Sequence, residues 1–185
     1  MSQAAYIRSL YAAIETLPDG MVGEIINGQL YTQPRPAGPH ALTVSNLGAD
    51  LIAPFGRGRG GPGGWWIIFE PEVHLKRDAE VVVPDMAGWR RERMPRIPND
   101  QRFDVVPDWV CEVLSPSTAS RDRELKMPLY ATYGVRHAWL IDPIARILEA
   151  FELREGSWTT LAAFRDGDRI CAPPFEALPL ESPWT

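Results

Sequence analysis

The chain of 185 residues contains little cysteine, little lysine and no long hydrophobic run. Neither of its two cysteines, Cys111 and Cys171, has a nearby cysteine or histidine to complete a zinc cluster, so we expect free, inert thiols. No stretch of 18 apolar residues occurs, and the N-terminal residues include no apolar leader segment. The sequence therefore predicts a soluble, cytoplasmic protein with no membrane partner.

Lysine is scarce among the basic residues. Of 19 cationic side chains, only Lys76 and Lys126 are lysines. A compact ammonium can shift its pKa, orient a water molecule and take part in proton transfer, whereas a guanidinium stays protonated. Retention of Lys126 against this bias favours a role that needs a lysine, with chance as the alternative.

A general excess of positive charge is also missing. The net charge of −5 argues against a protein coated in basic surface, so any contact with nucleic acid must come from a local patch. One candidate is the segment after Asp85, which Pro95 and Pro98 mark as a loop. This loop either contacts DNA phosphates beside the site, or it is a solvated loop or a subunit contact. Its arginines are Arg90, Arg91, Arg93, Arg96 and Arg102.

The hydrophobic content of 45% and seven tryptophans predict one domain over residues 1–185. A first helix is indicated by Tyr6, Leu10 and Ile14 at helical spacing, and Asn27-Gly28 predicts a type I′ hairpin turn between strands 22–26 and 29–32. We expect the chain after Pro173 to be irregular. Further predicted elements are helices over 40–53 and from about 120, and strands over 65–75, 81–83, 108–114, 138–141, 147–153 and 158–164.

Two other patterns resemble ligand sites. The glycine-rich run 56–64 contains a GxGxxG match, but this match follows a helix and precedes a strand, the reverse of a dinucleotide-binding motif, so we reject it. Glu70, Glu72 and His74 alternate along the predicted strand 65–75. These residue types can bind metals, but alternation is typical of a strand with one face in water, and we prefer that interpretation.

Glu112 lies in the middle of the apolar run 109–114. Burying an isolated carboxylate costs several kcal/mol unless a cation or hydrogen bonds compensate. Because side chains alternate along a strand, Val110, Glu112 and Leu114 should share one face, with Trp109 and Cys111 on the other. Glu112 must therefore have a partner beneath its apolar neighbours.

A second carboxylate, Asp85, follows Pro84 at a predicted strand boundary. Two carboxylates on adjacent strand ends, with Lys126 on the following helix, form a site for a hard divalent cation and a water that it activates. The alternative is an internal salt bridge between Glu112 and Lys126, since buried ion pairs also occur for structural reasons. These residue types leave both interpretations open.

An ordered series of motifs runs along the chain: Pro84-Asp85, then Glu112-Val113-Leu114-Ser115-Pro116-Ser117, then Asp122, Lys126, Tyr130, Gly134-Val135 and Trp139-Leu140-Ile141-Asp142-Pro143. This series resembles the Uma-type putative restriction endonuclease family, a branch of the PD-(D/E)XK nuclease superfamily. The resemblance covers residues 20–155 approximately. It implies an α/β (α+β) fold, with a restriction endonuclease-like core in which helices flank a mixed central β-sheet, and with the N-terminal helix and hairpin as additions.

The resemblance also implies that Asp85 and Glu112 bind magnesium for phosphodiester hydrolysis. One position departs from the superfamily pattern, which has a lysine two residues after the acid, where this chain has Leu114. Lys126 is the natural substitute, and Asp122 on the same helix face can hold its ammonium in position. Pro128 should kink this helix or remove one hydrogen bond.

Glu24 and His40 are two accessory candidates. The stretch that begins at Glu24 resembles the first acidic motif of the family, so Glu24 is either a third acid near the metal or a surface carboxylate at a strand edge. The family often places a histidine where this chain has His40. This side chain faces a phosphate or a water at the site, or it makes a hydrogen bond at the helix terminus.

These observations predict a Mg²⁺- or Mn²⁺-dependent endonuclease acting on DNA. Asp85, Glu112 and the Val113 carbonyl would hold the metal, and Lys126 would orient the attacking water and stabilise developing charge. A homodimer would match the twofold symmetry of a duplex. The alternatives are a catalytically inactive nuclease fold that binds nucleic acid or a protein partner, and a hydrolase acting on another phosphoester.

Overall fold

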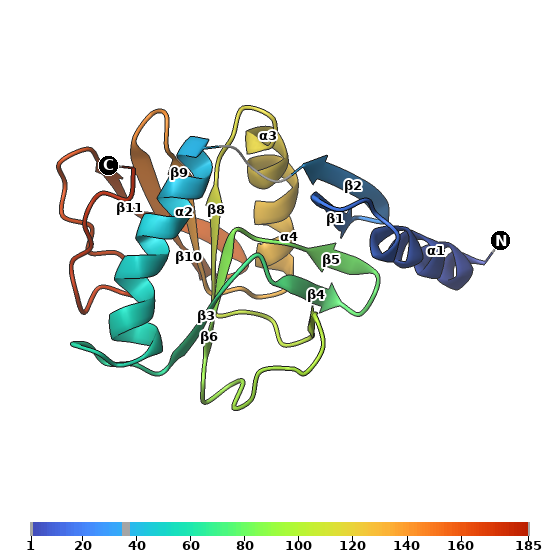
Figure 1. Ribbon diagram of the computed structural model, residues 1–185, viewed down its shortest axis with the longest axis horizontal. Coiled ribbons are helices and arrows are strands. Elements are labelled where there is room, and N and C mark those ends of the chain that lie inside the picture. Colours follow the sequence, from blue (N-terminus) through green and yellow to red (C-terminus); the bar gives the residue numbers. More distant parts are fainter. Residues whose placement is uncertain (1, 35–37, 185) are drawn as a thin grey trace.

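The structure is a computed structural model that describes residues 2–34 and 38–184 (Figure 1). Its helices are α1 (Gln3–Glu15), α2 (Gly38–Leu51), α3 (Ala119–Arg121) and α4 (Met127–Thr132), with π-helical turns η1 (Ile52–Gly56) and η2 (Asp122–Lys126). The strands are β1 (Met21–Ile26), β2 (Gln29–Pro34), β3 (Trp65–Phe69), β4 (Glu72–Lys76), β5 (Glu80–Val82), β6 (Met86–Arg90), β7 (Arg102–Phe103), β8 (Trp109–Val113), β9 (His137–Asp142), β10 (Ile147–Arg154) and β11 (Ser157–Arg165).

The strands form two mixed sheets. One has the order β11-β10-β9-β8-β6-β3, and the other has the order β2-β1-β5-β4-β7. In the first sheet β8 runs parallel to β9, and in the second β4 runs parallel to β7. The predicted α+β class is confirmed, but the expectation of one central sheet is wrong, because the N-terminal hairpin belongs to the second sheet.

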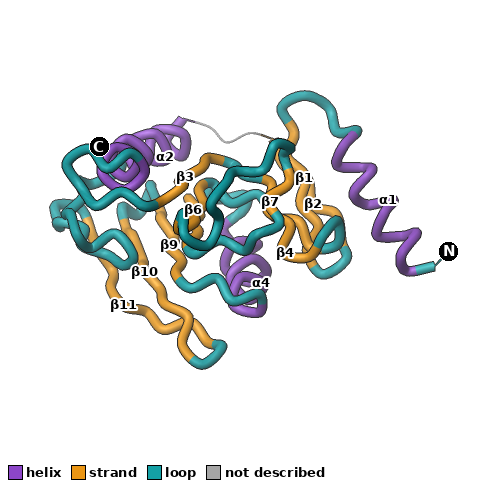
Figure 2. Tube along the Cα trace, turned by 90° about the horizontal axis from the view of Figure 1, so that it is seen from below, coloured by secondary structure: helices purple, strands orange, loops and turns teal. Residues whose placement is uncertain are grey.

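The six-stranded sheet lies between α2 on one face and α4 on the other (Figure 2). Trp109, Cys111 and Val113 pack with α2 in one hydrophobic cluster, and Val110 and Leu114 pack with α4 in another. This is the alternation predicted for β8. Hence Glu112 points toward the face that α4 covers, where it is 2% exposed.

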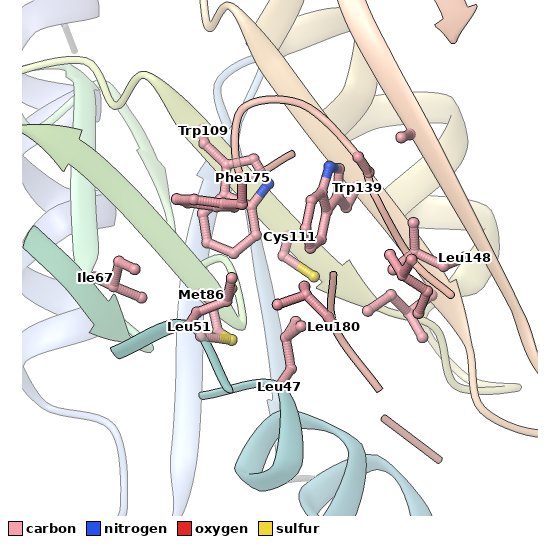
Figure 3. Close-up of a cluster of buried hydrophobic side chains, with 14 of the residues drawn as sticks. Leu47, Leu51, Ile67, Met86, Trp109, Cys111, Trp139, Leu148, Phe175 and Leu180 are labelled. Carbon is pink, nitrogen blue, oxygen red and sulfur yellow. The ribbon is translucent and has the colours of Figure 1, made fainter. Parts of the chain in front are cut away.

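The first cluster also buries the irregular C-terminal segment (Figure 3). The ring of Phe175 lies 5.0 Å from those of Trp65 and Trp109 and 5.6 Å from that of Trp139, measured between ring centroids. Cys111 is buried in the same cluster, and burial raises the pKa of its thiol. The tail therefore closes the α2 face of the sheet without a helix or strand of its own.

The N-terminal elements pack on the second sheet. Asn27 and Gly28 have φ values of 52° and 73°, the left-handed conformations that a type I′ turn requires. Tyr11 of α1 packs with Ile25 and Val81 in a third cluster. Within residues 2–34 and 38–184, no helix is long and apolar enough to span a membrane.

The predicted strand 65–75 is in fact two strands in different sheets. Glu70 has a φ of 43°, and Pro71 follows it, so the chain turns between β3 and β4. The expected water-facing row of Glu70, Glu72 and His74 is also wrong, because His74 is 1% exposed and its Nε2 lies 2.9 Å from Oε1 of Glu72. A buried histidine–carboxylate pair next to Tyr11 replaces the polar face.

Candidate active site

Asp85 and Glu112 lie side by side because β6 and β8 are neighbours. Met86 pairs with Cys111, which brings the residue before β6 next to the end of β8. There Oδ2 of Asp85 accepts a hydrogen bond of 2.7 Å from the backbone N–H of Val113. The carboxylate of Asp85 thus takes the place of a main-chain partner where the ladder between the two strands ends.

The segment after β8 turns back over the site. Within it, the N–H of Ala119 donates to the carbonyl of Ser115 and starts α3. The wider turn η2 follows, and the N–H of Met127 donates to the carbonyl of Asp122, five residues earlier. Pro128 then occupies the first turn of α4, where its missing N–H matters little. The disturbance expected at Pro128 takes the form of this π-helical turn, a feature frequent at functional sites.

Lys126 projects from η2 into a cage of oxygen atoms. Its Nζ lies 2.8 Å from Oε1 of Glu112, 3.0 Å from Oε1 of Glu24 and 3.8 Å from Oδ1 of Asp122. It also donates to the carbonyl of Val83 at 3.3 Å. With 1% of its surface exposed, Lys126 is a buried cation that touches all three acids.

Tyr130 completes the surroundings of Glu112. Its hydroxyl donates to Oε1 of Glu112 at 2.5 Å, the same oxygen that Lys126 contacts. The four-residue spacing of Asp122, Lys126 and Tyr130 placed this side chain on the right helix face. Sequence reasoning assigned it no role, because nothing in the spacing showed that the hydroxyl reaches Glu112.

Glu24 and His40 reach the site from the other side. Glu24 is 1% exposed and accepts a hydrogen bond of 2.9 Å from the N–H of Val83, so the strand-edge surface interpretation is wrong. Nε2 of His40 lies 3.1 Å from Oδ1 of Asp85, while its Nδ1 is buried without a partner among the described residues. Arg121, which sequence reasoning missed, has its Nε 3.7 Å from Oε2 of Glu24.

These side chains border one pocket of about 290 Å³, which His40, Asp85, Glu112, Asp122 and Lys126 help to line. Burial raises the pKa of Glu112 well above its usual value; Lys126 opposes the rise, and the neighbouring carboxylates add to it. Burial also raises the pKa of Asp122. For Lys126, burial lowers the pKa, but the surrounding carboxylates together raise it above its ordinary value, so the ammonium stays charged.

The predicted arginine loop is not beside this pocket. β6 runs antiparallel to β8, so Arg90 lies near the start of β8 while Asp85 lies near its end. Five strand residues separate the two by about 16 Å. Arg91 donates to the carbonyl of Gly56 at 2.6 Å, and Arg93 bonds Asp108 at 2.7 Å, so both also have internal partners. The expectation that this loop lies beside the site is wrong.

A similar architecture occurs in a crystal structure described as that of a "putative nuclease belonging to DUF820 from Anabaena variabilis ATCC 29413". The TM-score is 0.71 at 23% sequence identity, and the match covers 92% of this chain and 93% of that chain. The fold is therefore that of a nuclease-like α+β protein.

The model of the Uma2 family, described as "Putative restriction endonuclease", matches residues 10–181. The chain belongs to this family. No curated protein sequence matches the chain.

Proposed function

We propose that the protein is a metal-dependent endonuclease that hydrolyses DNA phosphodiester bonds, with Asp85 and Glu112 as ligands of Mg²⁺ or Mn²⁺. The observation that carries the proposal is the meeting of Asp85, Glu112 and Lys126 in one pocket. Three segments distant in sequence supply these groups, and a carboxylate pair with an adjacent ammonium is the chemistry that phosphodiester hydrolysis needs.

The charge of the pocket supports a further cation. Among the described residues that line it, Lys126 is the one permanent cation, against the carboxylates of Glu70, Asp85, Glu112 and Asp122. A divalent ion would relieve this excess of negative charge. The N–H and C=O of a strand residue point to the same side, so the Val113 carbonyl faces the edge where its N–H meets Asp85 and fits a third ligand.

The donor set fits Mg²⁺ better than a metal that needs a complete protein cage. Among residues 2–34 and 38–184, no group of three or more His, Cys, Asp or Glu side chains forms such a cage. Mg²⁺ usually binds through one or two carboxylates, several waters and substrate phosphates. Asp85 and Glu112 supply this minimal set, and Mn²⁺ accepts the same oxygen ligands.

When bound, the ion would supply Lewis-acid activation of the phosphate and of a water. Lys126 stays charged, so it cannot take a proton; it would donate hydrogen bonds to the attacking water and to the developing negative charge. Asp122 would hold the ammonium in place, and His40 would orient Asp85. Glu24 would stabilise Lys126 from the hairpin side, as a third acid of the site.

One observation favours a second candidate, a catalytically inactive nuclease fold that binds DNA or a protein partner. Lys126 already contacts both Glu112 and Glu24, and such an ion pair can be purely structural. The two candidates differ in whether a divalent ion binds and whether DNA is cut. A homodimer that cuts both strands of a duplex belongs to the first candidate.

The test is incubation of the purified protein with supercoiled and linear DNA in Mg²⁺, in Mn²⁺ and in chelator. We expect nicked or linear products with either metal and none with chelator. DNA binding without cleavage in both metals would favour the inactive fold, and cleavage that persists in chelator would remove the metal from the mechanism.

A further inference from the structure

Two loops meet at the end of the six-stranded sheet remote from the pocket. They are the glycine-rich run 56–64 and the segment 90–96, which together we call the arginine end. The N–H of Arg91 donates to the carbonyl of Gly64 at 2.9 Å, and its guanidinium donates to the carbonyl of Gly56 at 2.6 Å. Arg91 also lies 3.9 Å from the ring centroid of Trp66. It therefore joins the loops into one surface, which lies at the lower edge of Figure 1.

The charge of this surface is opposite to that of the whole chain. Residues 56–64 and 90–96 contain six arginines and one glutamate, a net charge of +5 in a chain of net charge −5. The rest of the chain therefore carries −10. Such a separation attracts a polyanion to one end of the molecule and repels it from the remainder.

Several of these arginines are free to bind. Arg57, Arg59 and Arg96 are exposed, and their side chains have no hydrogen bond or ion pair to any described residue. Arg90 lies over the ring of Trp65 at 4.6 Å and is exposed as well. Arg91 is thus the structural anchor, and the arginines around it keep unsatisfied donors.

We propose that the arginine end binds the phosphate backbone of a nucleic acid, at a place separate from the pocket of Asp85 and Glu112. The run Arg57-Gly58-Arg59-Gly60-Gly61 offers guanidinium groups on a backbone without side-chain bulk, as arginine–glycine segments that bind single strands do. An acidic protein fits less well, because protein interfaces need buried aromatic or aliphatic anchors. Ile97, beside this surface, is one exposed large hydrophobic residue.

The separation from the pocket gives this surface a binding role, not a catalytic one. It would raise the affinity for long nucleic acids and leave the chemistry at a bound phosphodiester unchanged. The inference rests on the proposed function only in taking DNA as the polyanion. It corrects the role expected for the loop in two ways, by moving the contact away from the acids and by adding Arg57 and Arg59.

The test measures DNA binding in chelator, with the Glu112→Gln variant as background so that no cleavage occurs. Affinity for a duplex of fixed length is measured by fluorescence anisotropy across a salt series. We expect Arg57→Gln/Arg59→Gln to weaken binding about tenfold at moderate salt and to reduce the slope of log K against log salt by about two, because each lost phosphate contact removes one counterion release.

The matched control is Arg8→Gln/Lys76→Gln, which removes two exposed charges from α1 and β4. An unchanged affinity and slope in the first double variant, or an equal loss in the control, would overturn the proposal. Competition by polyglutamate as strong as that by DNA would instead indicate an acidic protein partner and would also overturn it. Cleavage by the double variant that retains Glu112 is measured separately, so loss of the surface and loss of the nuclease activity are distinguishable.

Discussion

At the residue scale, the two oxygens of Glu112 have different environments. Oε1 accepts hydrogen bonds from Tyr130 and Lys126, and both donors are buried. A carboxylate held by one oxygen cannot rotate freely, so the second oxygen is presented to the pocket in a fixed orientation. Tyr130 is thus a positioning residue for the proposed metal ligand, because partners outside the ligand shell orient the ligands and tune them.

The substitution Tyr130→Phe tests this role. It keeps the buried ring but removes the hydroxyl, so we expect metal-dependent cleavage to fall about 10- to 100-fold and the Mg²⁺ concentration for half-maximal rate to rise. Tyr133→Phe, on the same helix, is the control, and it should have no such effect. An unchanged Mg²⁺ dependence in Tyr130→Phe would show that the hydroxyl only fills space.

At the element scale, the parts predicted well are those set by local patterns. The alternation around Glu112, the Asn27-Gly28 turn and the shared helix face of Asp122 and Lys126 each depend on neighbours in sequence. They place the acids and the ammonium correctly relative to their own elements. That is why much of the candidate site could be predicted before the fold was known.

The failures arise where distant segments decide the outcome. The break at Glu70 divides one predicted strand between two sheets, and only the pairing of β4 with β5 and β7 explains why the chain turns there. The remote location of Arg90 follows from the antiparallel pairing of β6 and β8, which a sequence does not show. Glu24 and Lys126 meet across more than 100 residues for the same reason.

The contact of α2 with β3 gives a prediction at this scale. A Cβ atom added at Gly48 would lie 2.2 Å from Cζ of Phe69, closer than any real contact, so the helix and strand pack through this glycine. We expect Gly48→Ala to lower the free energy of unfolding by about 1–3 kcal/mol, because overpacking outweighs the gain in helix propensity. Gly38→Ala at the start of α2, which meets nothing within 4 Å, is the matched control. Urea denaturation measures both, and a stabilised Gly48→Ala would contradict the packing.

At the scale of the whole molecule, charge is divided between the two ends of the six-stranded sheet. The acids lie where β8 ends, and the arginine end lies where it begins. His137 starts β9 at the arginine end, beside the start of β8. It is 8% exposed, and its Nδ1 has no partner among the described residues. The protein therefore buries a histidine that is stable only when neutral.

This burial predicts a pH-dependent stability. Burial lowers the pKa of His137 below its ordinary value of 6.5; Arg136 and Arg90 act in the same direction, and Glu152 and Glu176 oppose them. Below pH 6.5 the unfolded chain then takes up a proton more readily than the folded one, so the stability present above that pH is lost as the pH falls. We expect wild type to lose more stability than His137→Gln between pH 7.5 and pH 5.5, approximately the window in which an ordinary histidine titrates. Equal losses in urea titrations would sink this idea.

The central claim is that Glu112 holds a metal for DNA hydrolysis, and the most direct measurement compares cleavage of supercoiled DNA in Mg²⁺ by wild type, Glu112→Gln and Glu124→Gln. The first substitution removes the charge and keeps the shape of the buried acid, while the second changes an exposed acid near the same helix. All three proteins should remain folded, which thermal unfolding checks. We predict cleavage by wild type and Glu124→Gln and none by Glu112→Gln. Cleavage by folded Glu112→Gln at the wild-type rate would contradict the account.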